Sequence, residues 1–170
     1  TLFAVGEYNK VPKRDKSYYW YSTQQIRTTE GGYSGRVLHG PYTRYYTNNN
    51  LAESGTFKNG LKHGPWRSWY ADGGQQKEST WKDGEESGTF RLWDQQGRLL
   101  EQGRLRKGQR QGKVKAWNKD TKTAIDQYFD QGREITREEY AQRNVFSRTG
   151  NYIGKQWQKL FSKKEKATSD

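Results

Sequence analysis

Two histidines, His39 and His63, are the first residues to test for chemistry in this chain of 170 residues. Imidazole nitrogens bind zinc and transfer protons near neutral pH. The chain contains no cysteine, so zinc would need two or more further ligands from other side chains. We therefore expect a structural role for both histidines and no metal site.

Carboxylates are the second candidates for chemistry. Asp83, Glu85 and Glu86 stand beside a dipeptide that favours a tight turn, where we expect them to be solvated. Paired-carboxylate catalysis needs burial that separates two pKa values. With no cysteine nucleophile and no further histidine, the sequence shows no catalytic dyad. We expect a protein that is not an enzyme and that uses no cofactor.

Basic residues indicate binding in place of catalysis. The chain carries 31 Lys and Arg against 19 Asp and Glu, a net charge of +12. Basic side chains recur every 24 residues in two columns: Arg67, Arg91 and Lys115, and Lys58, Lys82 and Arg106. A basic stripe of this kind attracts acidic proteins, other polyanions or anionic lipid headgroups. The alternative is a charged surface that only keeps a thin sheet soluble.

Nucleic acid is a less favoured partner. Basic residues interleaved with aromatic rings can stack bases along a sheet. In this chain the aromatic residues recur in regular registers, which indicates that packing occupies them. No known nucleic-acid motif is present in the sequence either.

The elements that would position these residues follow from an internal repeat. Glycines recur at the same interval as the basic residues and the two histidines, in two long columns: Gly40, Gly64, Gly88 and Gly112, and Gly60, Gly84, Gly108 and Gly132. A column of aromatic residues keeps this interval as well: Tyr21, Tyr45, Trp69, Trp93 and Trp117. Periods of about 20 to 50 residues are typical of repeat architectures.

Each period has the features of one β-hairpin. Asn59-Gly60 and Asp83-Gly84 are dipeptides that favour tight hairpin turns, and the runs between turns are rich in aromatic residues and threonine, which favours strands. Neighbouring units would continue one sheet, because a single hairpin cannot bury its own apolar face. The sequence therefore predicts an all-β repeat protein. It would be an elongated antiparallel meander of 24-residue hairpins over residues 16–135, in about five units, with a short C-terminal α-helical cap.

One unit resembles a known repeat. Its residues follow the pattern G-x-aromatic-x-x-G-x-x-H-G-P-W-x-x-W/Y: Gly55, Phe57, Gly60, His63, Gly64, Pro65, Trp66, Trp69 and Tyr70. This pattern resembles the MORN repeat, specifically the bacterial MORN-variant form, in which the histidine belongs to the turn. The third and fourth units depart from it, since Glu86-Ser87-Gly88 and Arg110-Gln111-Gly112 replace Lys-His-Gly.

The resemblance implies a function as well as a fold. Bacterial proteins with this repeat are often labelled antitoxin-like or immunity-like, which implies a non-enzymatic module that binds an acidic protein partner and occludes a cognate effector. Trp69, Trp93 and Trp117 would then be anchors beside the basic columns. Eukaryotic relatives are associated with membranes, phosphoinositides and scaffolding. Peripheral binding to anionic membrane lipids, or a structural role in an envelope assembly, is therefore an alternative.

Both flanks of the repeat differ from it. Residues 1–15 lack the period and are expected to form an edge strand or a lead, and residues 136–170 a helical, basic cap. Thr136 and Glu139 have the spacing of a capping box, which predicts a short helix over residues 137–144. A second helical pattern covers residues 155–166. Its apolar and basic residues cap the sheet or contact a membrane: Trp157, Lys159, Phe161, Lys163 and Lys164.

The location of the protein is a further expectation. The chain begins at Thr1 and not at methionine, so we expect that a leader or a longer N-terminus has been removed. A periplasmic or envelope-associated location is favoured, with a cytoplasmic one as the alternative. No apolar run of about 18 residues exists, so we expect no membrane span. Exposed strand edges would allow copies of the chain to pair as homo-oligomers.

Overall fold

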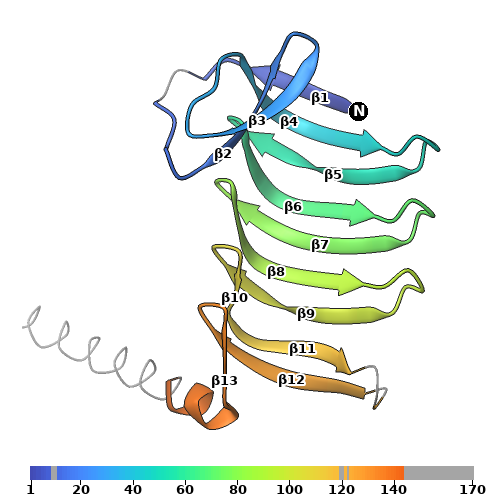
Figure 1. Cartoon of the computed structure of the whole chain (residues 1–170), viewed down its shortest axis with the longest axis vertical. Coiled ribbons are helices and arrows are strands. Elements are labelled where there is room, and N and C mark those ends of the chain that lie inside the picture. The colour runs from blue at the N-terminus through green and yellow to red at the C-terminus, as the bar shows by residue number, and fades with distance from the viewer. Residues whose placement is uncertain (9–10, 119–120, 122, 144–170) are drawn as a thin grey trace, which may run out of the picture.

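The protein is one antiparallel sheet whose strands are stacked along the long axis of the molecule (Figure 1). A computed structural model describes residues 1–8, 11–118, 121 and 123–143, and these contain thirteen strands. The strands are β1 (Leu2–Gly6), β2 (Ser17–Ser22), β3 (Gln25–Glu30), β4 (Arg36–Tyr45), β5 (Leu51–Lys58), β6 (Leu61–Trp69), β7 (Gln75–Lys82), β8 (Glu85–Trp93), β9 (Leu99–Arg106), β10 (Gln109–Arg110), β11 (Gly112–Asn118), β12 (Thr123–Asp130) and β13 (Arg133–Ile135). This architecture confirms the predicted all-β hairpin repeat.

The predicted meander holds from β4 onward and changes at the N-terminal end. From β4 to β9 each strand pairs with the next along the chain, and β9 pairs with both β10 and β11. At the other end β4 has three partners: β5 pairs with its residues 40–45, β2 with residues 36–37 and β1 with residues 37–43. Because residues 42–43 pair with both β1 and β5, these two strands lie on opposite sides of β4.

Tight turns join the strands of each hairpin on one side of the sheet. Both central residues have positive φ, as in Asn59 (54°) and Gly60 (80°), which is the geometry of a type I′ turn. The N–H of Gly60 donates to the backbone oxygen of Leu38 at 2.8 Å, a bond into the preceding unit. The equivalent bonds recur in the later units, from Gly84 to Lys62, from Gly108 to Glu86 and from Gly132 to Arg110. The turns therefore stack one per period.

Tyrosine hydroxyls link the turns on the opposite side. Tyr46 donates to the backbone oxygen of Trp69 at 2.7 Å, and Tyr70 donates to that of Trp93 at 2.8 Å. Asp94 occupies the next position of this column. Its carboxylate accepts two backbone N–H groups within its own turn and does not reach the next unit.

The core is a ladder of aromatic rings on one face of the sheet. Phe57 lies 5.2 Å from Tyr42 and 4.9 Å from Trp66 between ring centroids, both in edge-on contact. All three rings are buried, and Phe90 and Val114 continue the buried face in later strands. Edge-to-face rings at such distances stabilise a fold beyond the area that they bury. This packing compensates for a low content of aliphatic residues.

A short helix follows the last strand. Thr136 and Glu139 form the predicted capping box, with each backbone N–H donating to the other side chain at 3.1 Å. Residues 137–143 are helical, and Tyr140 packs against Tyr128 of β12 with 4.8 Å between the rings. The segment expected over residues 155–166 lies outside the described residues, as do Trp157, Lys159, Phe161, Lys163 and Lys164. Within the described part of the chain, no helix is long and apolar enough to cross a membrane.

Candidate functional site

The first basic column lies in a straight row across five strands. Opposite one another in successive strands are Arg67, Glu78, Arg91, Gln102 and Lys115. Residues directly opposite in an antiparallel pair lie on the same face of the sheet. The structure therefore brings the three predicted cations together on one face, with Glu78 and Gln102 between them.

Two carboxylates stand in or next to this row, Glu78 of β7 and Asp126 of β12, which is opposite Lys115. The carboxylate of Glu78 forms ion pairs with two guanidinium groups, that of Arg67 at 2.9 Å and that of Arg91 at 3.4 Å. Lys113 pairs with Asp126 at 2.7 Å, and this hydrogen bond raises the pKa of Lys113. Lys115 forms no ion pair with any described residue. Asp126 is therefore engaged by Lys113, although its register partner is Lys115.

Four cations surround a shallow hollow at the C-terminal end of this row. Arg91, Arg104, Lys113 and Lys115 line it from three neighbouring strands, together with Thr89 and Gln102. No acidic residue lines the hollow. Arg104, like Lys115, has no ion-pair partner in the described part of the chain. The arrangement can accept a carboxylate or another anion.

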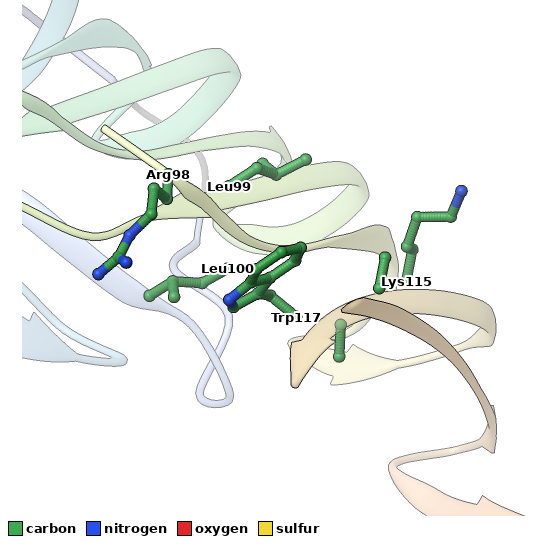
Figure 2. A pocket seen from close by; sticks show the side chains of 7 residues that line it. Arg98, Leu99, Leu100, Lys115 and Trp117 are labelled. Carbon is green, nitrogen blue, oxygen red and sulfur yellow. The ribbon is translucent and has the colours of Figure 1, made fainter. Parts of the chain in front are cut away.

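The tryptophan column lies two positions beyond the basic row on the same strands. Trp69, Trp93 and Trp117 are each half-buried. Trp117 lines an apolar groove of about 340 Å³ with Leu99, Leu100 and Ala124. Figure 2 shows Leu100 and Trp117 between Arg98 and Lys115, which stand at opposite ends of the groove.

The second basic column is separate from the first row. Lys58, Lys82 and Arg106 are exposed at the ends of β5, β7 and β9, each directly before a type I′ turn. None of the three forms an ion pair with a described residue. They place positive charge along the edge of the sheet where the tight turns stack.

The histidine column serves the turns. The Nδ1 atom of His39 lies 3.1 Å from Oδ1 of Asn59 and 3.3 Å from the backbone nitrogen of that residue. Later units place Ser87 and Gln111 in this column, and each accepts the backbone N–H of the equivalent turn residue at 3.1 and 2.9 Å. His63 lies 3.8 Å from Asp83. No three His, Asp or Glu residues cluster as metal ligands in the described part of the chain.

Two of the three carboxylates expected to be solvated are paired and partly buried. Glu85 accepts the ammonium group of Lys16 at 2.5 Å, and Lys16 itself is buried. Glu86 pairs with Lys77 at 2.6 Å, and its side chain is only 14% exposed. The expectation of solvation was wrong because it considered the turn alone, whereas Lys16, directly before β2, and Lys77 of β7 pair with these carboxylates.

A ladder of ion pairs on the aromatic face was not predicted from the sequence. Each pair joins the two strands of one hairpin, and the pairs occur in three successive hairpins: Glu53–Lys62 at 2.7 Å, Lys77–Glu86 at 2.6 Å and Glu101–Arg110 at 2.5 Å. The order of charge reverses at every unit. The signal was present in the sequence, because the columns 53, 77, 101 and 62, 86, 110 alternate in sign.

Aromatic rings hold the cation of the first pair. The ammonium group of Lys62 lies 4.0 Å from the centre of the Trp66 ring and 5.0 Å from that of Trp81. These distances are those of cation–π contacts. Lys62 is therefore held both by the carboxylate of Glu53 and by two aromatic rings.

The fold defines the class of protein, a single-sheet β-hairpin repeat. Residues 38–59 match the family model described as MORN repeat variant, which supports a MORN-repeat protein. Such repeats are generally protein-binding or membrane-binding modules, so a binding role fits. No curated protein matches the sequence.

Proposed function

We propose that the protein is a non-enzymatic module that binds an acidic surface of a partner protein and, in the manner of an antitoxin or immunity protein, occludes a cognate effector. The observation that carries the proposal is the row of Arg67, Arg91 and Lys115 on one face, with fewer carboxylates than cations. The antitoxin-like part rests on the resemblance of the repeat.

Charge and aromatic residues would have different tasks in such a complex. Cations at the surface steer an acidic partner toward the sheet and fix its orientation. Arginine and tryptophan are enriched among residues that dominate binding energy. Arg91 is opposite Glu78 of the neighbouring strand and two positions before Trp93 of its own strand. The continuous sheet supplies a rigid platform that could block an active site without chemistry of its own.

The test is capture of the partner from native cells by the tagged chain, at low and at high salt, with identification by mass spectrometry. We expect one stoichiometric protein that survives high salt and is lost with the double variant Arg67→Glu, Arg91→Glu. Replacing a buried cationic contact in an interface costs about 2–5 kcal/mol, so the affinity should fall at least about 30-fold.

A matched control makes the same change of charge elsewhere. The double variant Lys58→Glu, Lys82→Glu alters the turn edge and should leave the captured protein bound. Circular dichroism of both variants checks that the sheet is intact. Equal binding by wild type and both variants would contradict the role of the basic row, and a salt-labile scatter of acidic proteins would contradict a specific partner.

Peripheral binding to anionic membrane is the second candidate. It is favoured by the exposed turn-edge cations, which carry no ion pairs with described residues: Lys58, Lys82 and Arg106. Each basic residue near an anionic leaflet adds about 1 kcal/mol of attraction. We expect sedimentation with phosphatidylglycerol vesicles at low salt that weakens as salt rises. It should weaken further with Lys58→Glu, Lys82→Glu, Arg106→Glu, and with deletion of residues 150–170, which contain the predicted membrane-contact residues. A chain that stays in the supernatant at low salt would exclude this function.

A further inference from the structure

Two neighbouring hollows at the C-terminal end of the array share Lys115. One is the apolar groove of Leu99, Leu100, Trp117 and Ala124, and the other is the cationic hollow that also contains Arg104. They lie on the face that carries the basic row. Their junction places an apolar surface directly beside Arg104 and Lys115, neither of which forms an ion pair with a described residue.

Both hollows are departures from the repeat. At the positions of Leu99 and Leu100 the preceding unit has Gln75 and Gln76. Arg104 replaces Thr80 of the preceding unit at the same register. Lys113 likewise stands where the preceding unit has Thr89. The repeat itself does not require these residues, because the preceding unit forms the same hairpin without them.

We propose that these two hollows form one docking site for a short segment of a partner protein that presents a large apolar side chain next to carboxylates. The apolar side chain enters the groove against Leu100 and Trp117. Its neighbouring carboxylates pair with Arg104 and Lys115. The site rests on the proposed protein-binding function and names the part of the partner that is recognised.

Charge complementarity and shape together select this occupant. A free phosphate would satisfy the cations and leave the groove of about 340 Å³ unused. An apolar segment without acids would fill the groove and leave Arg104 and Lys115 unpaired. Burying the apolar side chain stabilises the complex in proportion to the area removed from water, and the desolvation that it causes strengthens the adjoining charge pairs.

The test uses three synthetic peptides and isotope-labelled full-length protein. The first peptide is acidic with a central Trp-Leu pair, the second keeps the acids but has Gly-Ser at the centre, and the third has lysines in place of the acids. We expect the first peptide to shift the indole N–H signal of Trp117 in NMR titrations. The other two should bind at least about 10-fold more weakly.

Variants that restore the repeat keep the fold while removing the site. Leu99→Gln with Leu100→Gln, and separately Arg104→Thr, copy residues that the preceding unit already accommodates at these registers. Each should weaken the first peptide at least about 10-fold. The reverse change, Gln75→Leu with Gln76→Leu, should create a second groove beside Trp93 and a shift of that indole signal.

The outcomes separate this site from the function on which it rests. Equal binding of the first two peptides, or the same Trp117 shift with inorganic phosphate or phosphatidylglycerol vesicles, would overturn the proposal. If the natural partner binds the repeat-restored variants normally but fails to bind Arg67→Glu, Arg91→Glu, the site is wrong and the proposed function stands. If the partner binds every variant equally, the proposed function fails.

Discussion

At Gly55 the absence of a side chain lets a tryptophan of the next strand lie flat on the sheet. A Cβ atom at this position would approach the Trp66 ring to between 2.2 and 2.7 Å, closer than any carbon contact allows. Ser79 holds the same register in the next unit, where its hydroxyl accepts the indole N–H of Trp81 at 3.1 Å. Gly55, which belongs to neither of the two long glycine columns, is therefore required by packing against Trp66.

Replacing Gly55 by alanine should destabilise the protein by about 1–3 kcal/mol, the usual cost of forcing extra volume into a packed core. The backbone there is not in the left-handed region, so the cost comes from the clash with Trp66. Urea unfolding followed by tryptophan fluorescence measures it. Gly32→Ala is the matched control, because no atom lies within 4 Å of its added Cβ. Equal stability of the two variants would refute the packing role.

Asp94 makes the stability of the fold depend on pH. Desolvation alone would raise the pKa of this carboxyl, but hydrogen bonds from the backbone and side chain of Arg98 outweigh it and hold the pKa below its usual value. A carboxyl with a lowered pKa in the folded state stabilises the fold above its unfolded pKa of about 3.9. That contribution is lost as the pH falls through the folded pKa.

The variant Asp94→Asn should therefore be less stable than wild type at neutral pH, and the difference should shrink as the pH falls below about 4. The amide oxygen can still accept backbone N–H groups, so the variant isolates the charge contact with Arg98 at 2.8 Å. Paired urea titrations across this pH range measure the difference in the free energy of unfolding. A difference that stays constant with pH would show that the carboxylate charge plays no part.

At the scale of elements, charge order on the aromatic face couples neighbouring hairpins. Glu53, Lys62, Lys77 and Glu86 line a single hollow with the rings of Trp66 and Trp81. Opposite signs are neighbours both within a hairpin and between hairpins. Breaking a buried pair leaves a charge without compensation, which costs more than the pair contributes when intact.

Reversing one member, Glu86→Lys, should destabilise the full-length chain by about 1–3 kcal/mol, a range reduced for the partial exposure of these pairs. The substitution would place four cations around one hollow, because Arg67 lines it together with Lys62 and Lys77. Thermal unfolding monitored by circular dichroism checks the effect. Asp126→Lys is the control, because its partner Lys113 is half exposed. A smaller loss for Glu86→Lys than for the control would contradict the coupling.

At the scale of the whole molecule, the sequence was enough to predict the period, the turns and the sheet. Asn59-Gly60 and its equivalents fix the turn geometry locally, and the aromatic columns report the buried face. The partners of β4 were not predictable, because the choice between β1 and β2 depends on strands far apart in the chain. The basic row followed from spacing alone. The groove at Trp117 could not be predicted from spacing, because it depends on which residues of the neighbouring strands lie beside Leu99 and Leu100.

Deleting residues 61–84 should leave a shorter folded array, because it joins Gly60 to Glu85 in the same turn register as Gly84 to Glu85. The deletion also places Glu53 opposite Glu86 in place of Lys62. In this shortened chain, Glu86→Lys should raise the free energy of unfolding by about 1–3 kcal/mol, the reverse of its effect in the full chain. If it destabilises both chains alike, charge order between units is unimportant.

The reversal of each ion pair from one hairpin to the next gives the charges a period twice that of the fold. Repeat genes lengthen by copying segments, and a copy of one hairpin here would set like charges against each other, whereas a copy of two would not. Two hairpins are therefore the shortest inserted segment that would keep the order of charges along the array. The same alternation disfavours misfolding of a nascent chain. Hairpins that associate one unit out of register would bring like charges together.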